Sequence, residues 1–158
     1  MPKTYSKQEI LSFLQKTSLM SVALCQKDNK PLSTILLFAL DDDFTLYFAT
    51  ISSSYKAKAI ENNKNISFSV WKPEEMLVQA NGVVDQITDQ KAAEEVVDKI
   101  AEAAASLDDF WPPVLQIKGH DYSGYKVKIN WLHALDLSSK NLVEKTSLFT
   151  EVELYDKT

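Results

Sequence analysis

The sequence predicts a mainly β fold with helices, in which six to seven strands form one antiparallel barrel and the helices lie at its ends. Expected strands outnumber expected helices, and most strand segments alternate between apolar and polar residues with a period of two. Short polar turns join neighbouring segments, as in a meander of antiparallel pairs. The chain has 158 residues, a length typical of one domain, so we expect a single domain over residues 1–158.

The composition argues against several kinds of partner. Hydrophobic residues make up 45% of the chain and charged residues 25%, and the net charge is −5. An acidic chain does not favour a nucleic-acid partner. No apolar run reaches the length of a membrane span, and the N-terminal residues lack the apolar core of a signal peptide. We therefore expect no membrane partner and a cytoplasmic location, in which Cys25, the only cysteine, stays a buried and inert thiol.

The first half of the chain predicts a helix followed by three strands. Ser6 and Glu9 have the spacing of a capping box, and apolar residues at helical spacing follow them. Strands are expected at residues 18–26, 31–40 and 44–49, with polar turns between them. Both faces of the segment 31–40 are apolar, so this strand is expected to be covered on both sides.

The second half predicts further strands and two helices. The expected elements are a short helix at 55–60, strands at 66–71 and 76–87, a longer helix at 88–107 and a strand at 125–137. Gly82 lies inside the strand 76–87 and indicates a bulge or a close backbone approach. Alternation along the last strand predicts one buried face. Its members are Tyr125, Val127, Ile129, Trp131, His133, Leu135 and Leu137. Residues 138–158 form a C-terminal extension, in which alternation from Leu148 onward indicates a late strand.

The loop after the strand 44–49 is rich in hydroxyl groups. Thr50-Ile51-Ser52-Ser53-Ser54 leads into Tyr55-Lys56-Ala57, and Ser53 or Ser54 suits the N-cap of the short helix. A helix N-terminus presents unpaired N–H groups and the positive end of the helix dipole, which together can bind a phosphate. Lys56 would add a full positive charge. The alternative is an ordinary capped helix with two solvated lysines, and spacing alone leaves both interpretations open.

Six short segments between residues 33 and 83 follow one another in an informative order. They are Ser33-Thr34-Ile35-Leu36-Leu37, Leu46-Tyr47-Phe48-Ala49-Thr50, Ser54-Tyr55-Lys56-Ala57, Ile60-Glu61-Asn62-Asn63, Ile66-Ser67-Phe68 and Val78-Gln79-Ala80-Asn81-Gly82-Val83. This series resembles the split barrels of the pyridoxamine 5′-phosphate oxidase-like family, which bind flavin mononucleotide (FMN), and in particular small general-stress-type members. The resemblance covers about residues 6–88, weakens towards residue 137 and is absent from the tail. It implies an FMN-binding split barrel that forms a homodimer with the flavin at the interface.

The resemblance also implies a cofactor site. The isoalloxazine ring would lie against the strand at residues 33–36, largely through backbone contacts, and the ribityl phosphate would be held at the start of the short helix. The implied cofactor-binding residues are Ser33, Thr34, Ile35, Leu36, Ala49, Thr50, Ser54, Tyr55 and Lys56. The oxidase has arginine at the positions of Ser33 and Tyr55, whereas this chain contains no arginine. A bidentate phosphate clamp is therefore ruled out, and weaker FMN retention is expected.

Three hypotheses about function follow. The first is an FMN-dependent oxidoreductase that acts on an unidentified small-molecule substrate, with the cofactor carrying the redox chemistry. The alternative is a non-catalytic flavin-binding or stress-related dimeric module. The third is a split-barrel dimer without FMN, in which the hydroxyl-rich loop is only a helix cap. No residue is assigned as a general acid or base. Oxidation of pyridoxamine phosphate itself is not expected, because an anionic substrate would require arginines.

Other kinds of site find no support in the sequence. His120 and His133 have no carboxylate or cysteine at metal-ligand spacing, so no metal is expected. The motif G-x-S-x-G of a nucleophilic serine is absent. With three glycines in the chain, there is no Gly-rich dinucleotide fingerprint.

Overall fold

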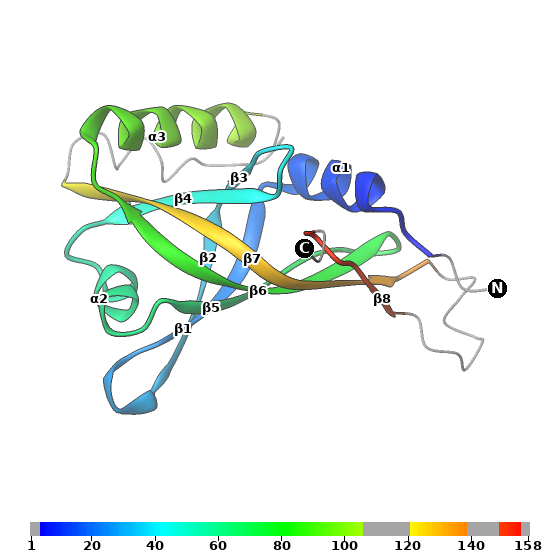
Figure 1. The fold of residues 1–158 in the computed structure, drawn as a ribbon, viewed down its shortest axis with the longest axis horizontal. Coiled ribbons are helices and arrows are strands. Elements are labelled where there is room, and N and C mark those ends of the chain that lie inside the picture. The colour runs from blue at the N-terminus through cyan, green and yellow to red at the C-terminus, as the bar shows by residue number, and fades with distance from the viewer. Residues whose placement is uncertain (1–3, 106–120, 139–148, 156–158) are drawn as a thin grey trace.

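A computed structural model describes residues 4–105, 121–138 and 149–155 of the chain. In these residues, eight strands form one sheet on which three α-helices pack (Figure 1). The helices are α1 (Lys7–Thr17), α2 (Tyr55–Asn62) and α3 (Gln90–Ala104), with a short 3-10 turn, η1 (Lys27–Asn29). The strands are β1 (Leu19–Cys25), β2 (Pro31–Leu37), β3 (Ala39–Leu40), β4 (Thr45–Ile51), β5 (Asn65–Lys72), β6 (Met76–Ile87), β7 (Tyr122–Asp136) and β8 (Phe149–Glu151).

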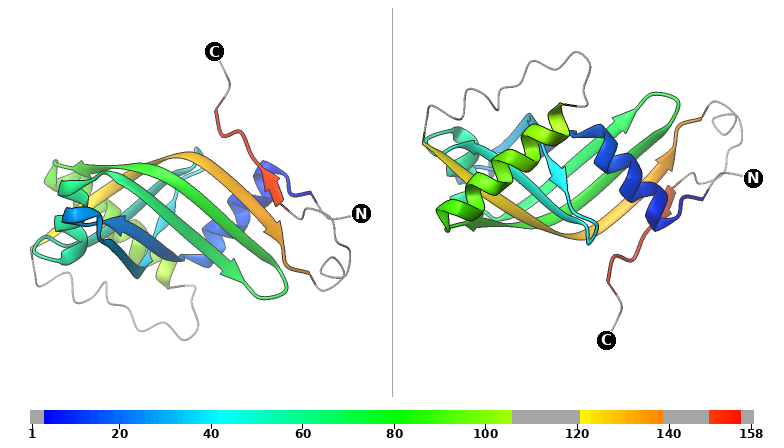
Figure 2. Two further views of the ribbon diagram at one scale, coloured as in Figure 1. Left: turned by 90° about the horizontal axis from the view of Figure 1, so that it is seen from below. Right: turned by 90° about the horizontal axis from the view of Figure 1, so that it is seen from above.

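The sheet curls into a split barrel (Figure 2). Its hydrogen-bonded order is β2-β1-β5-β6-β7-β4-β3, with β8 beside β7, and every pair is antiparallel. The two ends of this path, β2 and β3, are consecutive in the chain and are joined through Phe38, whose N–H donates to the carbonyl of Ser18 at 3.0 Å. β3 pairs with β4 only over Ala39 and Leu40. The barrel is therefore closed at Phe38 and open between β2 and the rest of β4, which confirms the predicted antiparallel split barrel.

The helices start where the sequence places them. In α1, the hydroxyl of Ser6 accepts from the N–H of Glu9, and the carboxylate of Glu9 accepts from the N–H of Ser6. α3 starts after Asp89, whose carboxylate accepts from the N–H of Ala92. α3 packs on β3, β4 and β7, α1 packs on β3 and β5, and α2 packs on β1 and β4. Among the helices that the structure describes, none combines the length and the hydrophobicity that a membrane span requires.

Inward-facing side chains of the strands fill the barrel. The largest fully buried residues include Val22, Phe38, Phe44, Leu46, Phe48, Ile129 and Leu132. Phe48 stacks on Tyr125 with the ring centroids 5.0 Å apart, a geometry that stabilises buried aromatic pairs. A second cluster joins Ala39 and Ala49 of the sheet to Val96, Val97 and Ile100 of α3. α3 therefore holds the end of β4 in place just before the hydroxyl-rich loop begins.

The segment 31–40 differs from its prediction in two ways. It forms two strands rather than one, because it changes its partner from β1 to β4 at Phe38. It is also not covered on both sides: the side chain of Leu36 is buried, whereas Ile35 is 63% exposed. β2 is an edge strand, and no element that the structure describes packs on its outer face. Cys25, at the end of β1, is likewise partly exposed rather than buried.

The second half of β7 also departs from its predicted pattern. The buried side chains of this strand include Tyr125, Val127, Ile129, Leu132, Ala134 and Asp136. Asn81 of β6 pairs with Trp131, but the next residue, Gly82, pairs with Ile129. Asn130 is therefore one extra residue, a β-bulge that shifts the alternation by one position. From Trp131 onward, the residues that we expected inside the barrel lie on its outer face.

Gly82 faces this bulge, and the predicted close backbone approach is confirmed. A Cβ atom added at Gly82 would lie 2.6 Å from Cγ1 of Val127 and 2.8 Å from the carbonyl oxygen of Lys128. Gly124 has more room, because the nearest atoms to an added Cβ belong to Ala93 of α3 at 3.4 Å.

We expect Gly82→Ala to lower the free energy of unfolding by about 1–3 kcal/mol, because the new methyl group overlaps a backbone carbonyl that is fixed in the β6–β7 ladder. Gly124→Ala is the matched control and should change this free energy by less than about 1 kcal/mol. Urea unfolding followed by circular dichroism measures both values. Equal stabilities of the two variants would show that the contact at Gly82 does not constrain the fold.

Candidate functional site

The loop between β4 and α2 is fixed by its own hydroxyl groups. Ser54 is the N-cap of α2, and its Oγ accepts from the N–H of Ala57 at 3.2 Å. The same Oγ lies 3.2 Å from Oγ1 of Thr50, and the N–H of Ser54 donates to the carbonyl of Ile51 at 3.0 Å. Of the two candidate caps, the structure therefore selects Ser54 and not Ser53.

The N-terminus of α2 presents unpaired amide groups. The N–H of Lys58 bonds to the carbonyl of Ser54 at 3.1 Å, whereas the N–H groups of Tyr55 and Lys56 lie before the first helical bond. Neither has an acceptor in the described part of the chain. The side chain of Lys56 is half-buried and forms no ion pair with a carboxylate described by the structure. Amide hydrogens, hydroxyls and one ammonium are donors that a phosphate accepts, so this set fits a phosphate group.

The open edge of β2 provides a second set of backbone groups. At the end of the β1–β2 ladder, the N–H of Phe38 donates to the carbonyl of Ser18, the residue that precedes β1. Hydrogen-bonded pairs alternate along an antiparallel ladder, so Thr34 and Leu36 also direct their backbone groups to β1. Ser33 and Ile35 therefore direct their N–H and C=O groups to the open edge. This alternation divides the four predicted ring-binding residues into two pairs whose backbone groups point in opposite directions.

The structure places the predicted residues on two sides of the opening in the barrel. Ala49 and Thr50 are buried at the end of β4, which pairs with β7 along its other edge. β2 lies across the opening and contacts β4. Tyr55 behaves differently, because its side chain is 75% exposed and lines a groove that contains none of residues 33–36.

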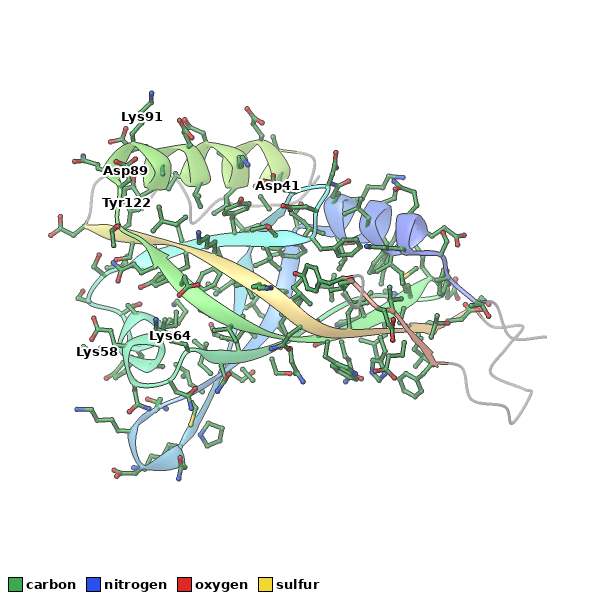
Figure 3. The ribbon with its side chains drawn as sticks, viewed as in Figure 1. Asp41, Lys58, Lys64, Asp89, Lys91 and Tyr122 are labelled. Atoms are coloured by element: carbon green, nitrogen blue, oxygen red, sulfur yellow. The ribbon has the colours of Figure 1, made fainter. Side chains whose placement is uncertain are left out.

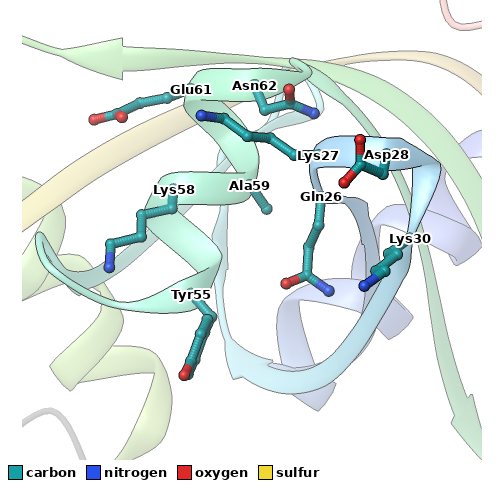
Figure 4. Close-up of a pocket in the computed structure, with 9 residues that line it drawn as sticks. All are labelled: Gln26, Lys27, Asp28, Lys30, Tyr55, Lys58, Ala59, Glu61 and Asn62. Carbon is teal, nitrogen blue, oxygen red and sulfur yellow. The ribbon is translucent and has the colours of Figure 1, made fainter.

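This groove was missed by sequence reasoning. It lies between α2 and the turn that joins β1 to β2, and its volume is about 710 Å³ (Figure 4). Its basic lining residues are Lys27, Lys30 and Lys58. Each lysine is visible in the sequence, but a local pattern cannot show that the turn and the helix lie side by side in the fold.

A polar network ties the hydroxyl-rich loop to the sheet. Oγ of Ser52 lies 2.9 Å from Oγ of Ser123 in β7, which also accepts from Nε2 of Gln86 in β6 at 3.3 Å. The N–H of Ser52 donates to the carbonyl of Asp121 at 3.0 Å. These bonds hold the loop from the side of β7, and Ser54 holds it from the side of α2.

His133 lies in an aromatic stack on the outer face of the sheet. Its Nε2 lies 2.7 Å from Oε1 of Gln79, and its ring centroid lies 4.4 Å from those of Trp131 and Phe149. Burial lowers the pKa of His133. Within the described ranges, no group of three His, Cys, Asp or Glu side chains is placed to hold a metal ion. His120 lies outside these ranges.

Comparisons with known proteins agree with this architecture. Residues 6–134 match the protein-family model described as pyridoxamine 5′-phosphate oxidase. The chain is similar in structure to the conserved hypothetical protein Rv2991 from Mycobacterium tuberculosis, with a TM-score of 0.74 and 20% sequence identity over 92% of this chain and 93% of that chain. No curated protein sequence matches the chain.

Two further solved structures are informative. One is the General Stress Protein 26 from Bacillus anthracis str. Sterne, with a TM-score of 0.63 and 19% identity over 92% of this chain and 98% of that chain. The other is a pyridoxamine 5′-phosphate oxidase-related, FMN binding protein from Nostoc punctiforme PCC 73102, with a TM-score of 0.64 and 13% identity over 92% of this chain and 87% of that chain. At such identities, the structural likeness establishes the fold alone.

Proposed function

The chain belongs to the pyridoxamine 5′-phosphate oxidase family, and from this membership we propose that it binds FMN and acts as an FMN-dependent oxidoreductase on a small-molecule substrate. One observation carries the proposal. A fixed set of phosphate donors at the junction of β4 and α2 stands beside an open strand edge, at the only place where the path of the described sheet is interrupted. The relative from Nostoc punctiforme, which is named as FMN binding, supports the same assignment.

The phosphate of FMN would be held at the start of α2. The unpaired N–H groups of Tyr55 and Lys56 point out of the helix end, where the helix dipole contributes about half a positive charge. The ammonium of Lys56 adds a full charge. Thr50 and Ser54 are hydrogen-bonded to each other, so together they offer one further hydroxyl hydrogen to the phosphate. A charge-assisted hydrogen bond contributes roughly 1.5–3 kcal/mol, so several such donors can hold a phosphate without arginine.

The isoalloxazine ring would lie along the open edge of β2. Ser33 and Ile35 direct backbone N–H and C=O groups to this edge, and these groups need partners when they are removed from water. The exposed side chain of Ile35 provides apolar surface beside them. A flat ring whose edge carries both donors and acceptors satisfies both requirements at once.

The chain's own residues bind, orient and shield the cofactor. FMN, when bound, supplies hydride and electron transfer to or from a substrate. Thr50 and Ser54 fix the loop, and Lys56 anchors the phosphate. The predicted binding set contains no carboxylate and no imidazole. An oxidoreductase at this site would therefore rely on FMN for its chemistry, and the same observation supports a second candidate function, a non-catalytic flavin-binding or stress-related module.

We also propose a homodimer whose interface includes the outer face of the sheet. Cross-strand pairs on this face continue from β2 to β7 through Ile35–Ser21, Ser21–Ser69, Ser69–Gln79 and Gln79–His133. The next row runs through Trp71–Leu77, Leu77–Leu135 and Leu135–Phe149. Trp71 is 60% exposed and Phe149 is 49% exposed, and exposed apolar residues that share one face mark interaction surfaces. A partner on this face would also approach Ile35 at the proposed ring site.

Lys56→Ala should weaken FMN binding by roughly tenfold or more, because it removes the full positive charge that Lys56 gives to the proposed phosphate site. Lys64→Ala is the matched control, since Lys64 is a surface lysine that pairs with Asp85 at 3.5 Å. Flavin fluorescence quenching measures both affinities, and circular dichroism checks the fold. If FMN binds equally to wild type and Lys56→Ala, the phosphate assignment is wrong.

The enzyme and the binding module differ in turnover. For an oxidoreductase, we expect the FMN-loaded protein to oxidise NADPH or NADH in the presence of an electron acceptor, and the rate should fall with FMN occupancy in Lys56→Ala. Absorbance at the wavelength of the reduced nicotinamide measures this rate. A protein that binds FMN but shows only the rate of free FMN at the same concentration is a module and not an enzyme.

Trp71→Lys should shift the protein from dimer to monomer, because a lysine that replaces an apolar side chain within the proposed interface loses its hydration without gaining a partner. Gln90→Lys places the same residue at an exposed position of α3 and should leave the dimer intact. Light scattering at micromolar concentration gives the mass of each variant. A monomeric wild type would contradict the proposed homodimer.

A further inference from the structure

The groove between α2 and the β1–β2 turn is not used by the proposed FMN contacts, yet it begins beside them. Tyr55 belongs to both, because its amide faces the phosphate site while its side chain lines the groove. From Tyr55, the groove follows α2 through Lys58 to Asn62, and Gln26 and Lys30 of the turn form the opposite side (Figure 4). A ligand could therefore extend from the phosphate site into the groove without crossing the barrel.

An exposed aromatic ring lies at the entrance of the groove. Tyr55 is 75% exposed, and Nζ of Lys58 lies 5.9 Å from the centroid of its ring. Nucleobases stack readily on such rings, because every base has a flat π-face. The ring of Tyr55 carries no structural role in the described core, so its exposure suits a ligand.

The charges that line the groove favour an anion of small charge. The lining contains three lysines, Lys27, Lys30 and Lys58, and two carboxylates, Asp28 and Glu61, which leaves an excess of one positive charge. None of the three lysines forms an ion pair with a carboxylate in the residues that the structure describes. In a chain with a net charge of −5, this local excess is suited to one phosphate.

Two side-chain amides, those of Gln26 and Asn62, also line the groove. Nδ2 of Asn62 donates to the carbonyl of Cys25 at 3.2 Å, which fixes the side chain and leaves its Oδ1 available as an acceptor. The amide of Gln26 has no partner among the described residues. Asn and Gln amides offer a donor and an acceptor side by side, the pattern that matches N6 and N7 of adenine.

We propose that this groove binds an adenosine phosphate group. The proposal rests on the proposed flavin function, because it takes the FMN site as the place where the rest of the ligand lies. The group belongs either to FAD, whose flavin half would occupy the FMN site, or to a nicotinamide dinucleotide that delivers its hydride to the flavin. Tyr55 would stack on the base, Lys30 and Lys58 would pair with the phosphate, and the amides would contact the base edge.

The double variant Lys30→Ala/Lys58→Ala tests the groove. Both lysines are exposed, so the fold should be unchanged by circular dichroism. We expect the affinity of the flavin-free protein for 5′-AMP to fall by roughly tenfold or more, whereas the affinity for FMN should change by less than about twofold. The matched control is Lys91→Ala/Lys126→Ala, which removes the same charge elsewhere. Figure 3 shows Lys91 on the outer side of α3 and Lys58 on α2.

Titrations with FAD and NADPH separate the two sources of the group. Tighter binding of FAD than of FMN, lost in the double variant, identifies FAD. Equal binding of FAD and FMN, together with NADPH binding to the FMN-loaded protein that weakens in the double variant, identifies the nicotinamide dinucleotide. The proposal is overturned if no adenosine phosphate loses affinity in the double variant, or if the control variant loses as much. A protein that binds 5′-AMP in this groove but no FMN would instead contradict the proposed flavin function.

Discussion

The change of partner at Phe38 is the constraint on which the rest of the architecture depends. The strand that begins at Pro31 pairs with β1, and two residues after β2 ends the same chain pairs with β4. The side chain of Phe38 is 1% exposed and lies in the core, and its N–H donates to the carbonyl of Ser18. These contacts fix Phe38 as the residue at which the strand changes partner. Strands that meet at one residue must diverge on either side of it. The barrel therefore stays open between β2 and the end of β4, and backbone groups remain unpaired where a cofactor can satisfy them.

The absence of arginine from the chain limits how tightly the opening in the barrel can hold a phosphate. All 17 of its Lys and Arg residues are lysine, and a lysine acts on a phosphate as a point charge without the two parallel bonds of arginine. The proposed phosphate binding at α2 would then depend on the sum of several separate donors: two amides, the one hydroxyl hydrogen that the Thr50–Ser54 bond leaves free, and Lys56. Because salt screens charges that water still reaches and Lys56 is only half-buried, the proposed flavin binding should weaken as ionic strength rises.

Local sequence patterns predicted the elements well and their surroundings less well. The bounds of β6 and the capping box of α1 followed from short-range signals such as Ser6 with Glu9, and the structure confirms them. For α2 the same signals left two candidate caps, of which the structure selects Ser54. The errors arose at Phe38 and Asn130, where a strand changes partner or gains a residue. A shift of one residue reverses every later side chain, and nothing near Asn130 in the sequence signals that shift.

The candidate site shows the same division between local and distant information. Ser54 as a cap and Lys56 beside it could be read from neighbouring residues. The direction of the backbone at Ser33 and Ile35 depends on which pairs of the β1–β2 ladder are hydrogen-bonded, and the groove depends on the meeting of a turn with a helix. Both are properties of contacts between segments distant in the sequence, so they appear only once the fold is known.

The bulge at Asn130 separates two ways in which this protein can change during evolution. Substitutions in β7 alter one side chain at a time, on whichever face it already occupies. The gain or loss of one residue at this position would exchange the two faces for the whole remaining strand, so that Trp131, His133 and Leu135 would trade places with Leu132, Ala134 and Asp136. Relatives with the same barrel can thus acquire different outer surfaces through a change in strand length, with the amino-acid composition almost unaltered.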